Sequence, residues 1–250
     1  MGAVYAIANQ KGGVGKTTTA INLAACLAEA GQRSLVVDLD PQANATSGLG
    51  ETANGSSSID LLDGAPLRDL ARPTRFANLD LVPAKADLAG TAAELSRRGD
   101  GERYLSDALA ATNGDYAFVF VDCPPSLGPL TVNALAAADR VLVPLQAEYY
   151  ALEGLAQLVR SVELIRARLN PRLAIGGVIL TMVDRRTRLA ADVDAEVRRH
   201  FGNLVFKASV PRSVRVAEAP SHGLPVTAYD PRSVGADAYW KVAMELVERT

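Results

Sequence analysis

The chain has 250 residues, of which 48% are hydrophobic and 22% are charged, a composition that excludes a disordered or fibrous protein. The 26 Lys and Arg residues nearly balance the 28 Asp and Glu residues, so the formal net charge is −2. This balance excludes a globally basic coat for nucleic acid but allows a local basic patch. Only five of the cations are lysines, and two of them, Lys11 and Lys16, lie in one glycine-rich segment.

The N-terminal segment and the cysteines indicate a protein of a reducing compartment. Residues 1–8 contain no charged side chain and too short an apolar run for a signal peptide. No apolar stretch approaches the ~20 residues that a membrane span needs. Cys26 and Cys123 are too few for a disulfide framework or a zinc cluster. We therefore expect a cytoplasmic protein with two buried, reduced thiols.

Apolar runs rich in β-branched residues alternate with helical patterns along the chain. Strands are predicted at residues 3–8, 34–38, 78–82, 117–121, 140–145, 174–181 and 203–208, with a further short one at 225–228. Helices are predicted at residues 16–30, 87–97, 102–112, 129–138, 151–169, 188–201 and 235–249.

Several of these strands are apolar at every position, which is typical of strands that are covered on both faces. The alternation predicts an α/β fold in which helices flank a doubly wound, mainly parallel sheet. We expect a single domain over residues 1–250. Residues 44–58 are rich in Gly, Ser, Thr and Asn, and they are predicted to form a mobile surface loop.

The first strand is followed by a glycine-rich loop and then by a helix that begins at Lys16. This order directs main-chain N–H groups and the positive end of a helix at one point, which suits a phosphate. Gln10 stands where the general pattern G-x-x-x-x-G-K-[ST] has its first glycine, and Lys11 enters the loop instead. Lys16 is expected to reach the β- and γ-phosphates, and the Thr17 hydroxyl to bind Mg²⁺. The predicted nucleotide-binding residues of the loop are Gly12, Gly13, Val14, Gly15, Lys16, Thr17 and Thr18.

Three carboxylates follow buried strands. Asp38 and Asp40 come at the end of strand 34–38, and Asp122 follows strand 117–121. Ligands of doubly wound sheets bind at this edge. Asp122 is expected to bind Mg²⁺ through water, as Walker-B aspartates do. The alternatives left open are turn-capping roles for Asp38 and Asp40 and a merely structural Asp122.

Five segments together resemble the ParA/Soj family of partitioning ATPases, within the ParA/MinD group that has a deviant phosphate loop. These segments run from Asn9 to Thr18, from Val37 to Gln42, from Val121 to Ser126, from Gln146 to Tyr150 and from Glu218 to Gly223. The resemblance covers nearly the whole chain and implies the fold of phosphate-loop nucleotide triphosphatases.

The resemblance also implies roles for individual residues. Lys11 would reach across a dimer interface to the nucleotide of the partner, although a role within its own subunit stays open. Asp40 would position the attacking water, so Lys11, Lys16 and Asp40 form the predicted catalytic set. Adenine would lie near Met182, Asp184 and Pro211.

Residues 185–215 carry eight Arg and Lys residues against three Asp and Glu residues, so this segment has a net charge of +5. Such asymmetry is typical of a surface that binds a polyanion. In ParA-like proteins, which this sequence resembles, arginines in the corresponding segment bind DNA without sequence preference. The matching positions are Arg186 and Arg215, and we add Arg185 and Arg188 to the predicted interface. The alternative is a solvated face of mixed charge.

These features predict an ATP-dependent DNA-partitioning ATPase that is cytoplasmic and associated with the nucleoid. ATP and Mg²⁺ would hold two copies in a sandwich homodimer that binds double-stranded DNA non-specifically. Hydrolysis is expected to be slow, to be stimulated by a ParB/Spo0J-like centromere-binding protein, and to release the DNA.

Three alternatives remain open. A MinD-like membrane-associated division-site ATPase would need a basic amphipathic tail, and residues 235–249 form a helix of mixed charge instead. We therefore expect no membrane partner. An iron–sulfur electron-transfer ATPase would need paired cysteines. A non-enzymatic DNA scaffold would bind DNA equally with and without nucleotide.

Overall fold

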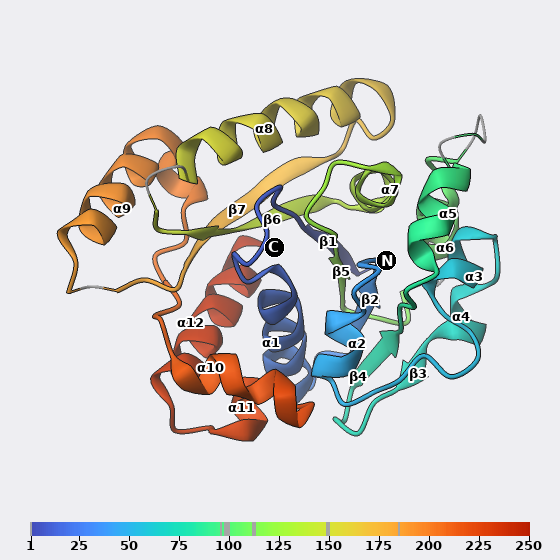
Figure 1. Ribbon diagram of the computed structural model, residues 1–250, viewed down its shortest axis with the longest axis horizontal. Helices are drawn as coiled ribbons and strands as arrows, with labels where there is room; N and C mark the ends of the chain where they lie inside the picture. Colours follow the sequence, from blue (N-terminus) through green and yellow to red (C-terminus); the bar gives the residue numbers. More distant parts are fainter. Residues whose placement is uncertain (1, 96, 98–100, 112–113, 149–150, 185) are drawn as a thin grey trace.

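A computed structural model describes residues 2–95, 97, 101–111, 114–148, 151–184 and 186–250. A seven-stranded sheet lies at its centre, in the order β3-β4-β2-β5-β1-β6-β7 (Figure 1). The strands are β1 (Ala3–Ile7), β2 (Ser34–Asp38), β3 (Arg72–Pro73), β4 (Leu79–Val82), β5 (Phe118–Asp122), β6 (Arg140–Gln146) and β7 (Ala174–Thr181). Every neighbouring pair is parallel except β3 and β4. The predicted doubly wound α/β class is confirmed.

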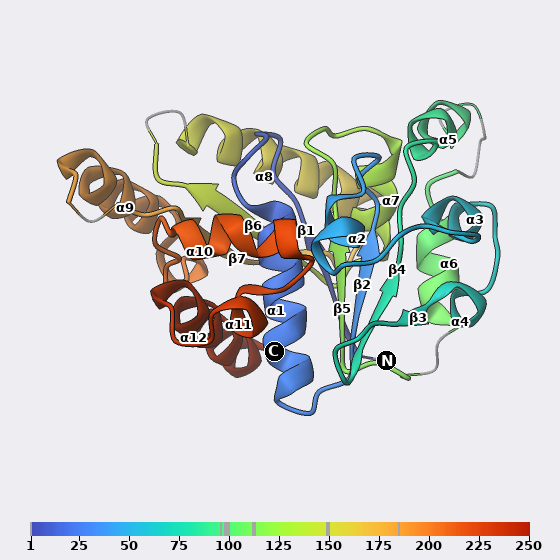
Figure 2. The same cartoon turned by 60° about the horizontal axis from the view of Figure 1, so that its bottom comes forward.

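Helices cover both faces of the sheet (Figure 2). One face packs against α1 (Lys16–Glu29) and α12 (Val234–Arg249), together with the short α2 (Asn44–Gly48) and α11 (Val226–Tyr229). The other face packs against α3 (Ser58–Leu62), α4 (Leu67–Leu70), α5 (Leu88–Leu95), α6 (Tyr104–Ala110), α7 (Pro129–Ala137), α8 (Ala151–Arg168) and α9 (Arg188–Phe201). The remaining helices are α10 (Val214–Glu218) and the 3-10 turns η1 (Gly202–Leu204) and η2 (Ala219–His222).

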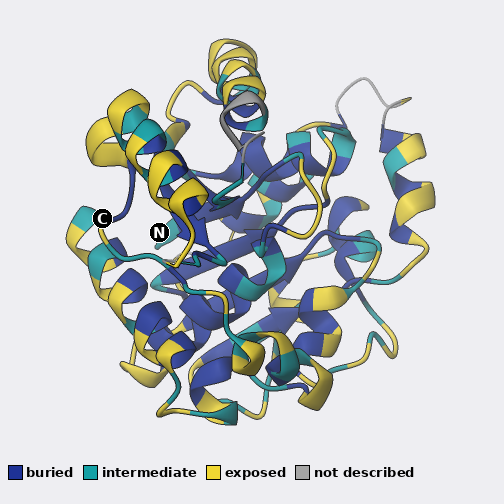
Figure 3. Ribbon diagram, turned by 60° about the vertical axis from the view of Figure 1, so that its left-hand side comes forward, coloured by how far each residue is buried: buried dark blue, intermediate teal, exposed yellow. Residues whose placement is uncertain are grey.

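The all-apolar strands explain this layering. Successive residues of β1 point to opposite faces, so Val4 and Ala6 enter one core while Tyr5 and Ile7 enter the other. Tyr5 stacks on Phe120 with ring centroids 5.7 Å apart. Both side chains are almost completely buried, and each contributes about 2–3 kcal/mol of hydrophobic stabilisation. Figure 3 shows the strands as the buried centre of the molecule.

Both edges of the sheet are closed. At one edge, β3 is only two residues long and ends in Pro73. At the other edge, the N–H groups of Phe206 and Val210 donate to the carbonyls of Val178 and Leu180 on β7, at 2.9 and 2.8 Å. These contacts cover the outer side of β7 with the chain that follows η1.

Three predictions about local structure are wrong, namely two predicted strands and one predicted loop. Residues 203–208 form no strand beyond a single bridge between Val178 and Val205, because the N–H groups of Lys207 and Ala208 turn to the carboxylate of Glu245. Residues 226–229 are helix α11 rather than a strand.

The polar segment 44–58 is not a loop throughout, since it contains α2 and the start of α3. Arg72 donates to the carbonyl of Ser56, and Lys85 donates to that of Gly55. Cations from β3 and from the chain after β4 therefore hold this segment in place. Within the described ranges, no helix is long and apolar enough to span a bilayer.

Candidate functional site

The loop between β1 and α1 lies at the carboxyl ends of the parallel strands. Gly13 and Gly15 have φ angles of 73° and 88°, which glycine adopts without strain. No side chain caps the start of α1 at Gly15, so the first N–H groups of the helix are left for a ligand. The Thr181 hydroxyl donates to the Val14 carbonyl at 2.8 Å and fixes the loop against β7. The loop therefore presents main-chain donors that suit an anion.

A cavity of about 730 Å³ opens beside this loop. Its lining includes Gly12, Gly13, Gly15, Lys16, Thr17, Thr18, Asp40, Met182 and Pro211, all of them predicted from the sequence. It also includes Asn44, Ser47, Thr181, Arg212 and Tyr239, which sequence reasoning missed. Arg212 could have been found because it directly follows Pro211. The others come from elements that only the fold brings to the loop.

Lys16 lies in the wall of the cavity and is only 7% exposed. Its Nζ donates to the carbonyl of Lys11 at 3.2 Å. Burial lowers the pKa of Lys16, and the nearby Asp122 and Asp40 oppose this effect. An anion in the cavity would supply the negative charge that a buried ammonium requires.

Two carboxylates lie side by side at the ends of neighbouring strands, since Asp38 on β2 is in register with Asp122 on β5. Asp38 accepts hydrogen bonds from Thr46 N at 2.9 Å, from Thr46 Oγ1 at 2.7 Å and from Asp40 N at 3.1 Å. Burial nevertheless raises its pKa to about 6. Asp38 therefore ties α2 to the sheet and does not line the cavity.

Asp122 differs because both of its carboxylate oxygens are buried and neither has a hydrogen-bond partner among the described residues. Burial and the neighbouring Asp38 raise its pKa well above the usual range, whereas Thr17 and Lys16 act in the opposite direction. A buried carboxylate without a donor is costly unless a cation accompanies it. The hydroxyl of Thr17 and the carboxylate of Asp122 are hard oxygen donors of the kind that Mg²⁺ prefers, so a magnesium ion fits here.

Asp40 caps a turn at the edge of the cavity. Its Oδ1 accepts a hydrogen bond from Gln42 N at 2.9 Å, as a turn-capping aspartate does. The side chain also lines the cavity. A carboxylate held by its own turn is oriented before any ligand arrives.

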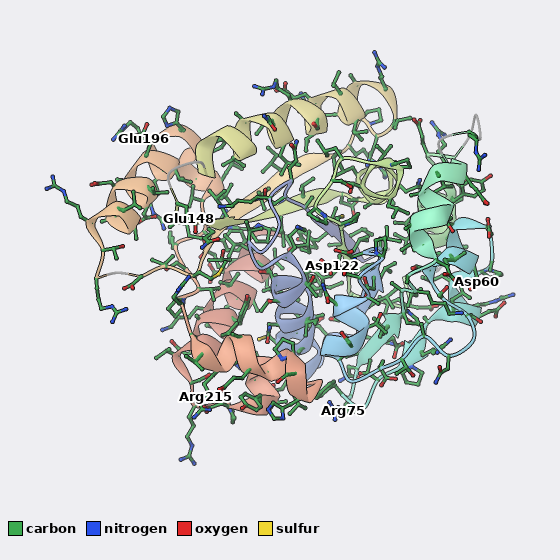
Figure 4. All side chains as sticks on the ribbon, viewed as in Figure 1. Asp60, Arg75, Asp122, Glu148, Glu196 and Arg215 are labelled. Carbon is green, nitrogen blue, oxygen red and sulfur yellow. The ribbon has the colours of Figure 1, made fainter. Side chains whose placement is uncertain are left out.

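Lys11 lies outside the cavity lining and forms an ion pair with Glu148, which follows β6 (Figure 4). Both side chains are 45% exposed. The Lys11 ammonium therefore contacts a residue of its own chain in this structure. An exposed pair of this kind is weakly held and can exchange for another anion.

The residues predicted near the base separate into two groups. Met182, whose φ is 50°, and Pro211 reach the cavity. Asp184 does not line it and instead binds Arg186 through Nε at 2.8 Å and Nη2 at 2.7 Å. These hydrogen bonds lower the pKa of Asp184 to about 2.

Arg185 lies outside the described residues, and the other predicted arginines, Arg186, Arg188 and Arg215, lie on the surface. The side chain of Arg186 is 88% exposed and that of Arg188 is 95% exposed. Arg215 on α10 pairs with Glu218 at 3.0 Å and with Asp230 at 3.3 Å (Figure 4). On α9, Arg198 and Arg199 are paired with acidic residues of the same helix. The segment therefore presents Arg186 and Arg188 most openly.

Comparisons with known proteins agree with this geometry. A family model described as an AAA domain matches residues 2–175. The chromosome partitioning protein ParA of Caulobacter vibrioides is 53% identical, over 98% of this chain and 94% of the relative. The sporulation initiation inhibitor protein Soj of Bacillus subtilis is 51% identical, over 98% of both chains. The chain belongs to the ParA/Soj family of chromosome-partitioning ATPases.

Solved structures extend the ParA/Soj comparison. The cobyrinic acid a,c-diamide synthase of Mycobacterium smegmatis, with a bound ATP analogue and magnesium, superimposes with a TM-score of 0.87 at 37% identity, over 99% of this chain and 95% of that one. The septum site-determining protein MinD of Pyrococcus horikoshii, complexed with Mg-ADP, is more distant. Its TM-score is 0.78 at 27% identity, over 98% of this chain and 96% of that one.

Proposed function

We propose that this ParA/Soj ATPase uses ATP and Mg²⁺ to control its binding to DNA. The observation that carries the proposal is Asp122, a buried carboxylate without a donor, beside Thr17 and Lys16 at the glycine-rich loop. Thr17 and Asp122 would hold the magnesium ion, Asp122 through water, and the ion would offset the charge of the phosphates. Lys16 and the loop N–H groups would bind the phosphates, while Asp40 would orient the attacking water. Because phosphoryl transfer depends on such positioning, a site with a single orienting carboxylate is expected to turn over slowly.

The second part of the proposal concerns assembly. Lys11, whose ammonium forms an exposed ion pair with Glu148, would move to the nucleotide of a second copy and join the two subunits through ATP. Arg186, Arg188 and Arg215, with Arg185, would then contact the DNA backbone from both subunits. Two weak surfaces on one dimer bind far more tightly than one surface on a monomer.

The biological setting is proposed from the relatives. Their names, at 51–53% identity, concern chromosome partitioning and sporulation, which favours DNA segregation over the diamide synthesis named for the less similar Mycobacterium smegmatis structure. A ParB/Spo0J-like protein would stimulate hydrolysis and so release the DNA. We propose a cytoplasmic protein that collects on the nucleoid.

DNA binding across a salt series tests this proposal. A double-stranded fragment of arbitrary sequence is titrated with the protein in ATP, in ADP and without nucleotide. We expect tight binding with ATP only, with an affinity that falls steeply as salt rises, because phosphate contacts release counterions. Equal binding in all three states would indicate a scaffold, and ATP-dependent sedimentation with liposomes but not DNA would indicate a MinD-like protein. Lys16→Ala, which should abolish the ATP response, is compared with Lys241→Ala on the exposed face of α12.

A further inference from the structure

The nucleotide cavity has two walls that come from distant parts of the chain. Asn44 and Ser47 of α2 line one side, next to Asp40. Val216 and Pro220, from α10 and η2, line the other side. Whatever holds α2 against η2 therefore sets the width of the cavity at this end.

The two walls meet through glycine backbone. A Cβ on Gly223 would lie 2.5 Å from the Cα of Gly50, and a Cβ on Gly50 would lie 3.2 Å from the carbonyl oxygen of Gly223. Both glycines have positive φ angles, 76° at Gly50 and 64° at Gly223. Neither position can carry a side chain that would interlock the walls. This contact is called the glycine seam below.

The walls share no main-chain hydrogen bond across the glycine seam, where every residue is described. The N–H of Gly50 donates to Ser47 and that of Gly223 donates to Pro220, so each wall satisfies its own backbone. Backbone contact alone offers little apolar area to bury, and therefore little stabilisation. Ala45 and Leu49 on one side and Ala219 on the other belong to one hydrophobic cluster, and a group at the seam itself would add to their packing.

Arg75 supplies that group from the turn between β3 and β4 (Figure 4). Its Nη2 donates to the carbonyl of Gly223 and, at 3.3 Å, to that of His222. The same Nη2 would meet a Cβ on Gly50 at 2.7 Å, so the guanidinium touches both sides of the glycine seam. Hydrogen bonds from a charged donor are stronger than those between neutral groups.

The guanidinium is itself held in place. It lies over the ring of Phe76, 5.3 Å from the ring centroid. Thr74 fixes the turn, because its hydroxyl accepts from the N–H of Phe76 at 3.1 Å and donates to the carbonyl of Leu79 at 2.7 Å. Arg75 thus reaches the seam from a rigid turn anchored on the sheet.

We propose that Arg75 is a positioning residue of the nucleotide site, although it does not line the cavity. By clamping the glycine seam, Arg75 holds α2 and η2 at the spacing that nucleotide binding requires. Without the clamp, the two walls separate more readily, and a nucleotide must spend part of its binding energy on closing them. Hydrolysis of the bound nucleotide depends on the glycine-rich loop and on Asp40. Loss of the clamp therefore leaves the rate of hydrolysis unchanged once the nucleotide is bound. This inference rests on the proposed nucleotide site and adds to it a residue that sets affinity.

Steady-state kinetics and nucleotide titration test the clamp with three variants. Arg75→Ala removes it, and Arg75→Lys keeps a charged donor that cannot reach both sides of the seam. Arg68→Ala is the matched control, because Arg68 is an 82% exposed arginine on α4 with only a loose contact, at 3.7 Å, to Asp69. For Arg75→Ala we expect the KM for ATP and the Kd for ADP to rise about 3–10-fold, with kcat within about twofold of the parent. Arg75→Lys should fall between the parent and Arg75→Ala, and Arg68→Ala should match the parent.

Several outcomes would overturn the inference. Unchanged nucleotide affinity in Arg75→Ala would do so, as would a fall in kcat at constant KM. If Arg75→Ala does not fold, parental affinity in a folded Arg75→Lys would have the same force. A parent protein that binds no ATP at all would instead contradict the proposed function, so the two failures are distinguishable.

Discussion

Asp38 and Asp122 occupy matching positions on β2 and β5, yet among the described residues only the carboxylate of Asp38 accepts well-formed hydrogen bonds. Two buried carboxylates side by side repel each other. Asp38 is therefore integrated into the fold through its hydrogen bonds, whereas Asp122 is the residue proposed to accompany a cation. This difference predicts opposite effects for the same chemical change at neighbouring positions.

Asp122→Asn should stabilise the nucleotide-free protein by about 1–3 kcal/mol, because it removes the cost of burying an ionisable carboxyl group and keeps the shape of the side chain. It should also abolish the extra thermal stability that Mg²⁺ adds in the presence of ADP. Asp38→Asn should destabilise by a similar amount, since an amide cannot accept every hydrogen bond that Asp38 accepts. Urea denaturation in EDTA measures both changes. Loss of stability in Asp122→Asn would contradict the cation role.

The stability of the nucleotide-free protein should depend on pH. The folded-state pKa of Asp38 is about 6, above its ordinary value of 3.8, so the folded protein binds more protons than the unfolded protein between these values. The free energy of unfolding should therefore fall as pH rises from about 4 to about 6. Asp122 acts in the same direction. Denaturation at a series of pH values without Mg²⁺ measures the slope, which should flatten in Asp38→Asn.

Asp40→Ala should lower the rate of ATP hydrolysis by about 100-fold or more while ATP binding persists, because the attacking water loses its orienting group. We expect the ATP-bound dimer to accumulate, which light scattering detects. Asp69→Ala, which removes a 62% exposed carboxylate on α4, is the control. Parental turnover in Asp40→Ala would remove Asp40 from the mechanism.

Reversing the charge at Arg186 and Arg215 together should weaken DNA binding by about 100-fold or more and lower the salt dependence of binding, because phosphate contacts from both subunits are lost. ATP-dependent dimerisation should persist. The control is Arg68→Glu, which makes the same Arg-to-Glu change at an exposed position on another surface. Gel shifts that match the parent would exclude these arginines from the interface.

Much of the fold follows from local sequence. Residues 118–121 are apolar at every position because β5 lies at the centre of the sheet, and the spacing of Gly12, Gly13, Gly15 and Lys16 predicts a loop that the structure places at the strand ends. The apolar segments near Val205 and Val226 predict strands wrongly, because their apolar residues pack onto the core without pairing as strands.

The partners in the site are harder to foresee. Glu148 contacts Lys11 across 137 residues, and Arg75 contacts Gly223 across 148. No periodicity links such positions, since the topology alone brings them together. Residue types predict the chemistry of a phosphate loop, but not the side chains that restrain it.

The closed edges of the sheet restrict how this protein can self-associate. Pro73 has no N–H to offer to an incoming strand, and the outer side of β7 is occupied by the chain around Phe206 and Val210. Polymerisation by edge-to-edge strand addition, the usual route to amyloid-like aggregates, is therefore blocked at both ends. If the protein gathers on DNA as proposed, this arrangement protects it at high local concentration from irreversible cross-β assembly.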